Sequence, residues 1–271
     1  MSKKAINQNT NYNEELLNSI GSNFIFGKNP INRLKNTANN LKAENNVDEV
    51  DKEKKLAQLK VQINSIEDCS LKNNSKKIIL GDGNINSSIM LVGEAPGINE
   101  DSTGLTFVGE VGKLLEKMLI GEAPGLDEDN TGLTFTGEVG ILLTKMLIAI
   151  NIKKENIYST YAVNFRTPED RKPTSIEIKR YSQFLQKHIS IIRPKIIILM
   201  GSTAMEALTG LNSKITIERG KWKEVIVKNT NYNVIITFNP SYLLRVPENK
   251  KHSWEDLKKI KQKIIDLKLN V

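Results

Sequence analysis

Short apolar runs alternate with longer segments of helical periodicity along most of the chain. The apolar runs, at 78–80, 89–92, 157–163, 196–200, 225–227 and 234–237, have the length and branched-residue content of strands. The segments 54–66, 175–192, 202–208 and 253–267 repeat apolar residues every three or four positions, which predicts helices. Strands that alternate with helices predict an α/β fold, a three-layer α/β/α sandwich around a mostly parallel sheet.

The first 53 residues have a different character. Two short helical patterns within 13–42 are separated by a turn at Gly27-Lys28-Asn29-Pro30, and residues 43–53 are charged and contain asparagine. We therefore predict a helical N-terminal arm with a polar linker at 1–53. A globular domain should follow at 54–271.

One stretch of the domain is written twice. Gly93–Ile120 and Gly121–Ile148 are identical at 22 of 28 positions without a gap. Two units are too few for a solenoid, which needs about three to bury its faces, so the pattern indicates a tandem duplication.

Each copy contains a Gly/Pro turn, an acidic loop and an amphipathic helix such as 111–119. A strand candidate at 89–92 directly precedes the first copy. The order strand, glycine turn, polar loop, helix is how an α/β protein places a ligand at the carboxyl end of its sheet. Gly93 and Gly97 could also serve only a tight turn, or cradle a phosphate, although no P-loop lysine follows them.

Only one of the two copies can adjoin the pocket. The first copy is approached by the apolar segment 85–92, whereas the residues before the second copy, 118–120, belong by the repeat's own periodicity to a helix. We expect the first copy to form the pocket and the second to be an extra loop and helix on the surface. The alternative, in which 118–120 replaces the strand, stays open.

The amino-acid composition indicates the cellular compartment. The chain is 39% hydrophobic and 26% charged, has a single cysteine, Cys69, and contains no run of the ~20 apolar residues that a membrane span needs. Its start lacks the apolar core of a signal peptide, so we expect a cytoplasmic protein without a membrane partner.

The net charge of +8 is unevenly distributed. Residues 93–148 hold ten carboxylates and three lysines, so the rest of the chain carries about +15. This pattern suits an enzyme that binds a polyanion and keeps carboxylates for chemistry, although solvated lysines on an ordinary surface would give the same balance.

Five motifs in order resemble those of family 4 uracil-DNA glycosylases, and most of them stand at a strand or its end. They are GEAPG-x-x-ED-x-x-G-x-x-F, R-x-P-x-x-R-x-P, PKIIILMG, ERG and PSYLLR. The similarity covers about residues 13–267, including FGKNPINRL, and is greatest to the branch that lacks an iron–sulfur cluster. It implies a monomer that removes uracil from DNA in base-excision repair.

The resemblance also implies roles for particular residues. Catalysis would fall to Glu94, Glu100, Asp101 and Asn239, with Glu122, Glu128 and Asp129 as second-copy alternatives. Uracil would be bound by Gly93, Ala95, Phe107 and Tyr161, with Phe135 as the second-copy alternative to Phe107, the ring that stacks on the flipped base. DNA would contact Arg166, Arg171, Ser241, Tyr242, Leu243, Leu244 and Arg245, one of the two leucines being a wedge. Less specific roles stay open for three of these: Glu100 and Asp101 as exposed loop charges, and Phe107 as a core residue.

The chain departs from the family at three points. The positions of four cluster-binding cysteines hold Ile66, Cys69, Phe165 and Tyr181, so we expect no cluster, no other cofactor and no metal. The uracil-reading asparagine falls on Tyr161, and Asn164 lies three positions on, facing the opposite side of a regular strand. The histidine of the family's HPS motif is Asn239, a neutral donor where an imidazole could be cationic.

These departures leave two rivals to uracil excision. One is a decayed glycosylase that still binds DNA without excising a base. The other is an enzyme that acts on a different damaged base.

Overall fold

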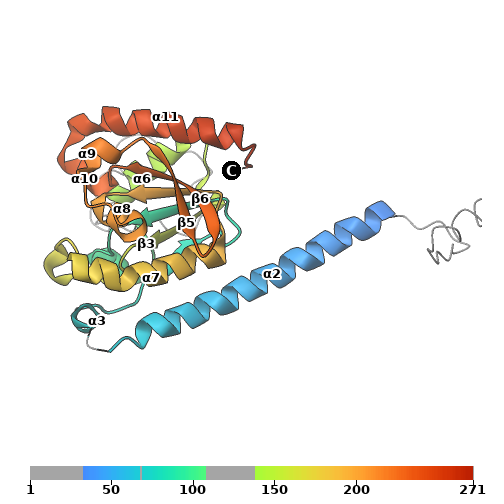
Figure 1. The fold of residues 1–271 in the computed structure, drawn as a ribbon, viewed down its shortest axis with the longest axis horizontal. Helices are drawn as coiled ribbons and strands as arrows, with labels where there is room; N and C mark the ends of the chain where they lie inside the picture. Colours follow the sequence, from blue (N-terminus) through green and yellow to red (C-terminus); the bar gives the residue numbers. More distant parts are fainter. Residues whose placement is uncertain (1–32, 68, 108–137, 271) are drawn as a thin grey trace, which may run out of the picture. The chain divides into compact units, whose positions relative to one another are not determined.

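The structure is a computed structural model that describes residues 33–67, 69–107 and 138–270 (Figure 1). The chain divides into two units after Val47, and the second unit, Asp48–Val271, carries the sheet. In the described part of the first unit the backbone is helical. No described helix is both long enough and apolar enough to cross a membrane.

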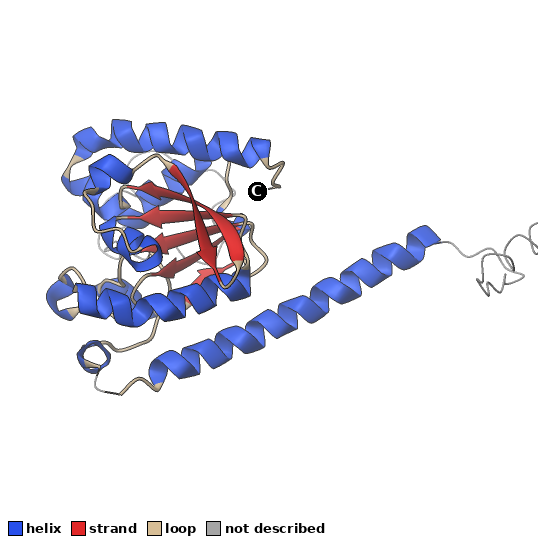
Figure 2. Cartoon of the chain, viewed as in Figure 1, coloured by secondary structure: helices blue, strands red, loops and turns tan. Residues whose placement is uncertain are grey.

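Six strands form one mixed sheet in the order β1-β3-β2-β4-β6-β5 (Figure 2). They are β1 (Gly81–Gly83), β2 (Ile89–Gly93), β3 (Ile157–Tyr161), β4 (Ile196–Met200), β5 (Trp222–Val227) and β6 (Thr230–Thr237). The four inner strands run parallel, and the edge strands β1 and β5 are each antiparallel to their neighbour. The expected mostly parallel sheet is therefore confirmed.

Helices cover both faces of the sheet. The helices are α2 (Arg33–Asn64), α3 (Ser70–Asn74), α4 (Ile98–Thr103), α6 (Glu138–Ile148), α7 (Ser175–Ile192), α8 (Ser202–Thr209), α9 (Ile215–Glu218), α10 (Pro240–Arg245) and α11 (Lys250–Asp266). Within the described residues three short 3-10 turns accompany them: η1 (Lys154–Asn156), η2 (Pro168–Asp170) and η3 (Pro247–Asn249).

The two faces are built by alternate residues of the same strands. In β2, Ile89 and Leu91 join an apolar cluster with α6 and α11, while Met90 and Val92 join a second cluster with α7 and α8. All five residues of β2 are buried, as are all five of β4, which explains their unbroken apolar sequences.

For some elements the bounds predicted from sequence periodicity agree with the structure. Helix α7 has the predicted bounds, and its N-cap Thr174 accepts a hydrogen bond from the Glu177 N–H while the Glu177 carboxylate accepts one from the Thr174 N–H. This reciprocal capping box satisfies two backbone donors that would otherwise have no intrahelical partner. The expected strand at 78–80 lies instead at Gly81–Gly83.

The expected linker at 43–53 is helical. Residues 43–53 lie inside α2, which continues into the part of the second unit that contains Leu56, Leu59 and Ile63. All three of these side chains are buried in the apolar clusters of that unit. Tertiary packing of these three side chains stabilises the C-terminal part of α2.

The duplicated segment contributes parts of both copies. Strand β2 leads into the first copy's turn and acidic loop as far as Phe107, while the helix that packs on the sheet is α6, from the second copy. Residues 108–137 lie outside the described residues, and they include the segment 111–119, expected to be the first copy's helix, and Glu122, Glu128, Asp129 and Phe135. Our expectation that the second copy's helix is a surface addition is wrong, because Leu143 and Leu147 are buried in the same cluster as Phe107.

This division predicts the effect of removing one repeat length. Deleting residues 108–135 would join Phe107 directly to Thr136 and leave the described loop and α6 in place. We expect the shortened protein to fold and to be at least as stable as the parent, since each halving of a connection lowers its closure cost by about 0.6 kcal/mol. Urea unfolding followed by circular dichroism measures the difference. A deletion variant that does not fold would show that the removed residues are needed by the sheet.

Candidate active site

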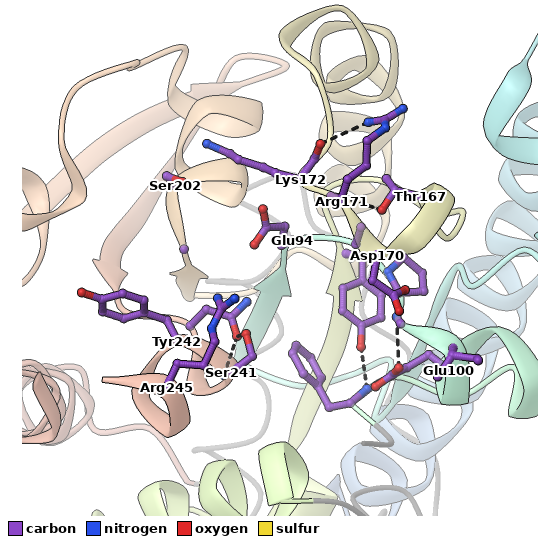
Figure 3. Close-up of a pocket in the computed structure, with 18 of the residues that line it drawn as sticks. Glu94, Glu100, Thr167, Asp170, Arg171, Lys172, Ser202, Ser241, Tyr242 and Arg245 are labelled. Atoms are coloured by element: carbon purple, nitrogen blue, oxygen red, sulfur yellow. Dashed lines mark hydrogen bonds between the residues drawn. The ribbon is translucent and has the colours of Figure 1, made fainter. Parts of the chain in front are cut away.

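A cavity of about 700 Å³ opens at the carboxyl ends of the parallel strands (Figure 3). Each inner strand contributes residues from its end or just beyond it. These are Glu94 to Glu100 after β2, Tyr161 of β3, Gly201 and Ser202 after β4, and Phe238 and Asn239 after β6. The volume falls within the range typical of ligand pockets, and the position is the one that an open parallel sheet favours.

Glu94 lies at the tip of β2, with Ser202 and Ser241 on one side and Glu100 on the other (Figure 3). The buried Thr203 hydroxyl donates to Glu94 Oε1 at 2.5 Å and fixes the carboxylate. Gly201, whose φ of +102° favours glycine, lies near both this carboxylate and the Asn239 amide. A Cβ placed on Gly201 would lie 3.9 Å from Glu94 Oε2 and 3.7 Å from Asn239 Nδ2.

Asn239 is the N-cap of α10 and its side chain is held in a fixed orientation. Its Oδ1 accepts hydrogen bonds from the Ser241 N–H at 3.0 Å and from the Ser241 hydroxyl at 2.8 Å. With Oδ1 used in this way, the Nδ2 donors remain for the cavity. A neutral donor therefore stands where the family resemblance has a histidine.

Phe107 and Tyr161 form one wall of the cavity. Their ring centroids are 5.0 Å apart, and the Phe107 N–H donates to the Tyr161 hydroxyl at 2.7 Å. Gly93 lies behind the two rings, since a Cβ there would come within 2.7 Å of the Tyr161 ring. It does not line the cavity. Ala95 does line it.

The paired carboxylates Glu100 and Asp101 have separate roles. Glu100 lines the cavity and accepts the Gly97 N–H at the start of α4. Asp101 faces away from the cavity and accepts from the Ser75 hydroxyl and the backbone N–H groups of Lys76 and Lys77. Burial alone would raise the pKa of Asp101, but these three bonds hold it below its ordinary value. Asp101 is thus a structural anchor, contrary to our assignment, and neither carboxylate is an exposed loop charge.

The two arginines of the 166–173 loop are paired with carboxylates. Arg166 makes a bidentate pair with Asp170, and Arg171 makes one with Glu177. Arg171 lines the cavity mouth, whereas Arg166 does not. Both guanidinium groups stabilise the loop through these ion pairs. If either arginine also contacts DNA, it must do so in addition to this structural role.

Helix α10 separates the two candidate wedge residues. Leu243 is 1% exposed and packs in the apolar core, so it is excluded as a wedge. Leu244, the next position, points elsewhere on the short helix and is half-buried. Ser241, Tyr242 and Arg245 line the cavity, and the Tyr242 hydroxyl accepts from Asn249.

The four positions that correspond to cluster ligands come together in an apolar cluster. Phe165 and Tyr181 pack edge to face with centroids 6.2 Å apart, Ile66 packs alongside, and Cys69 Sγ lies 3.1 Å from the Tyr181 hydroxyl. A cluster with four thiolate ligands does not fit residues of these types. Among the described residues no group of three or more His, Cys, Asp or Glu side chains could hold a metal ion.

Sequence reasoning missed several lining residues. They include Gly201, Ser202, Phe238 and Lys172. The first three follow the apolar runs of β4 and β6 directly, so their position at a strand's carboxyl end was a usable signal. Lys172 stands between two prolines in a charged loop, and nothing in that pattern indicates that it reaches the cavity. Asn164 lies beyond the end of β3, donates to the Ile79 carbonyl and is buried without lining the cavity.

A pocket lined by carboxylate, amide and aromatic groups at the carboxyl ends of a parallel sheet is typical of α/β enzymes. Comparison with known proteins gives the family. The model of the uracil DNA glycosylase superfamily matches residues 80–120 and 115–258, so each match contains one copy of the duplicated turn. The chain belongs to the uracil-DNA glycosylase superfamily.

Named relatives agree with this assignment. The chain is 32% identical over 196 residues to a type-4 uracil-DNA glycosylase of Thermotoga maritima, an overlap that covers 71% of this chain and 86% of that protein. It is 34% identical over 214 residues to one of Sulfurisphaera tokodaii (76% and 84%). A third, of Archaeoglobus fulgidus, is 33% identical over 203 residues (73% and 88%).

Proposed function

We propose that this protein is a uracil-DNA glycosylase, which hydrolyses the N-glycosidic bond of a uracil flipped out of DNA. The observation that carries the proposal is the combination of family membership with one cavity lined by Glu94, Phe107 and Asn239. The relatives' names state the same activity for those proteins. The excised base would leave an abasic site for repair.

The chemistry follows from how charge develops as the bond breaks. A base inside a duplex is out of reach, so the nucleotide must rotate into the cavity at a cost of a few kcal/mol. Breaking the bond puts positive charge on the sugar and negative charge on uracil. The carboxylates of Glu94 and Glu100 would stabilise the sugar cation and orient water, and the Asn239 amide would donate to the departing base.

The rest of the cavity suits the flipped nucleotide and its neighbours. Phe107 offers a ring on which the base can stack, and Tyr242 and Arg245 stand where the strand enters. Leu244, half-buried on α10, is the remaining candidate for the residue that fills the vacated space in the duplex. The net charge of +8 favours binding to the phosphate backbone.

An excision assay tests the proposal directly. The purified protein is incubated with single- and double-stranded DNA that contains one uracil, and heating in alkali then reveals abasic sites. We expect strand cleavage at the uracil position and none in matched thymine DNA. DNA binding without cleavage would indicate a decayed glycosylase. Cleavage only in parallel duplexes that carry another damaged base in place of uracil would indicate a changed substrate.

One prediction from the proposed function concerns which copy supplies the site. In the full-length protein, Glu100→Gln combined with Phe107→Ala should abolish excision, because both residues line the cavity. The matched control changes the equivalent second-copy residues, Glu128→Gln with Phe135→Ala, and should leave the rate unchanged. Loss of activity in the control alone would make the second copy the working site.

A second prediction concerns the departing base. Asn239→His should raise the excision rate by about tenfold, since hydrogen bonds to charged groups contribute roughly 1.5–3 kcal/mol and neutral ones roughly 0.5–1.5 kcal/mol. Asn239→Ala is the control and should lower the rate. Both changes alter the N-cap of α10, so the free energy of unfolding must be measured beside each rate. A histidine variant no faster than the parent, and equally stable, would exclude Asn239 as the limiting group.

A third prediction concerns the cofactor. We propose that the enzyme works without an iron–sulfur cluster, because three of the four ligand positions hold apolar or aromatic side chains. The purified protein should be colourless and contain no stoichiometric iron by metal analysis. Visible absorbance with iron bound in proportion to protein would contradict this.

A further inference from the structure

Tyr161 and Phe107 are joined by more than ring packing. The Tyr161 hydroxyl accepts the Phe107 backbone N–H at 2.7 Å, and Tyr161 is 4% exposed. Tyr161 ends β3 directly beside Gly93 of β2, its partner in the parallel ladder. The absence of a side chain at Gly93 leaves the space that both rings occupy. Tyr161 therefore reaches from the end of one inner strand to the backbone of the loop after another.

Phe107 needs such a restraint. Its φ of +53° lies in the left-handed region, which aromatic residues rarely adopt. A residue held in this region persists only when its surroundings impose the conformation. The hydrogen bond to Tyr161 and the packing of the ring against it are two such constraints. Together they set the direction in which the Phe107 ring faces the cavity.

We propose that Tyr161 is a positioning residue, whose hydroxyl holds the Phe107 ring as a platform for the flipped base. The hydroxyl oxygen already accepts the Phe107 N–H, so it is engaged with the protein backbone. Through this hydrogen bond Tyr161 acts on the base by way of the Phe107 ring. This inference rests on the proposed function in one respect, because the base is taken to stack on Phe107.

A double-mutant cycle tests the inference through activity. Tyr161→Phe keeps the ring and removes only the hydroxyl, and should lower single-turnover excision about two- to tenfold, as expected for one lost hydrogen bond. In a Phe107→Ala background the same change should have no further effect, because the platform is gone. Equal losses in both backgrounds would overturn the inference, since Tyr161 would then act independently of the Phe107 ring.

Tyr158→Phe is the matched control. Tyr158 is a second buried tyrosine of β3, but its hydroxyl lies 2.9 Å from His188 Nε2 and it does not line the cavity. Removing this hydroxyl should leave the excision rate unchanged. A loss equal to that of Tyr161→Phe would attribute the effect to general weakening of β3, against the inference.

Amide exchange tests the contact without any assay of activity. In protein labelled with ¹⁵N-phenylalanine, the Phe107 amide should exchange slowly in the parent and in Tyr158→Phe, and faster in Tyr161→Phe. An exchange rate unchanged by Tyr161→Phe would overturn the inference even if excision fell. If the parent excises no uracil, the proposed function fails, while this measurement still decides whether Tyr161 restrains Phe107.

Discussion

The structure depends on a single position in the sheet, the one occupied by β2. This strand is paired on both sides by parallel neighbours, β3 and β4, and all five of its residues are buried. Whatever sequence follows β2 is delivered to the cavity, because the carboxyl ends of the inner strands meet there. Only one turn and acidic loop can therefore follow β2. In this structure it is the first copy's loop.

The same constraint explains why the helix after the loop can come from the other copy. Pairing on both edges of a strand determines where the residues that follow the strand begin. A helix on the face of the sheet is held only by side-chain packing. The helices of the two copies differ at few positions, and Leu143 and Leu147 of α6 supply the apolar contacts that the cluster with Phe107 requires. Because the two sequences are nearly identical, the sequence alone did not indicate that the second copy's helix packs in this cluster.

Much of the fold was predictable from the sequence. The unbroken apolar run of β4 and the periodicity of α7 gave their bounds directly, since burial on two faces and on one face leaves distinct patterns. The directions in which particular side chains of the loops and short helices point were not predictable. Asp101 turns from the cavity to cap a loop 25 residues away in sequence, and Leu243 turns into the core from a one-and-a-half-turn helix. Both depend on local geometry that residue type does not encode.

Three of the positions at which the chain departs from the family hold aromatic residues. Three positions that would ligate metal or read a base now hold Phe165, Tyr181 and Tyr161, and each aromatic ring packs against another. Glu94 and Asn239 both lie near Gly201 and line the cavity, where under the proposed function they would face the breaking bond.

The central claim is that DNA with a flipped uracil occupies the cavity formed by the first copy's loop and α10. Hydrogen–deuterium exchange, read by mass spectrometry, tests it with a duplex containing 2′-fluoro-2′-deoxyuridine, which resists excision, against the same duplex containing thymine. We expect the uridine duplex to protect residues 94–107 and 239–245 more than the thymine duplex does, with no such difference at 122–135. Selective protection of 122–135, or equal protection by both duplexes, would contradict the account.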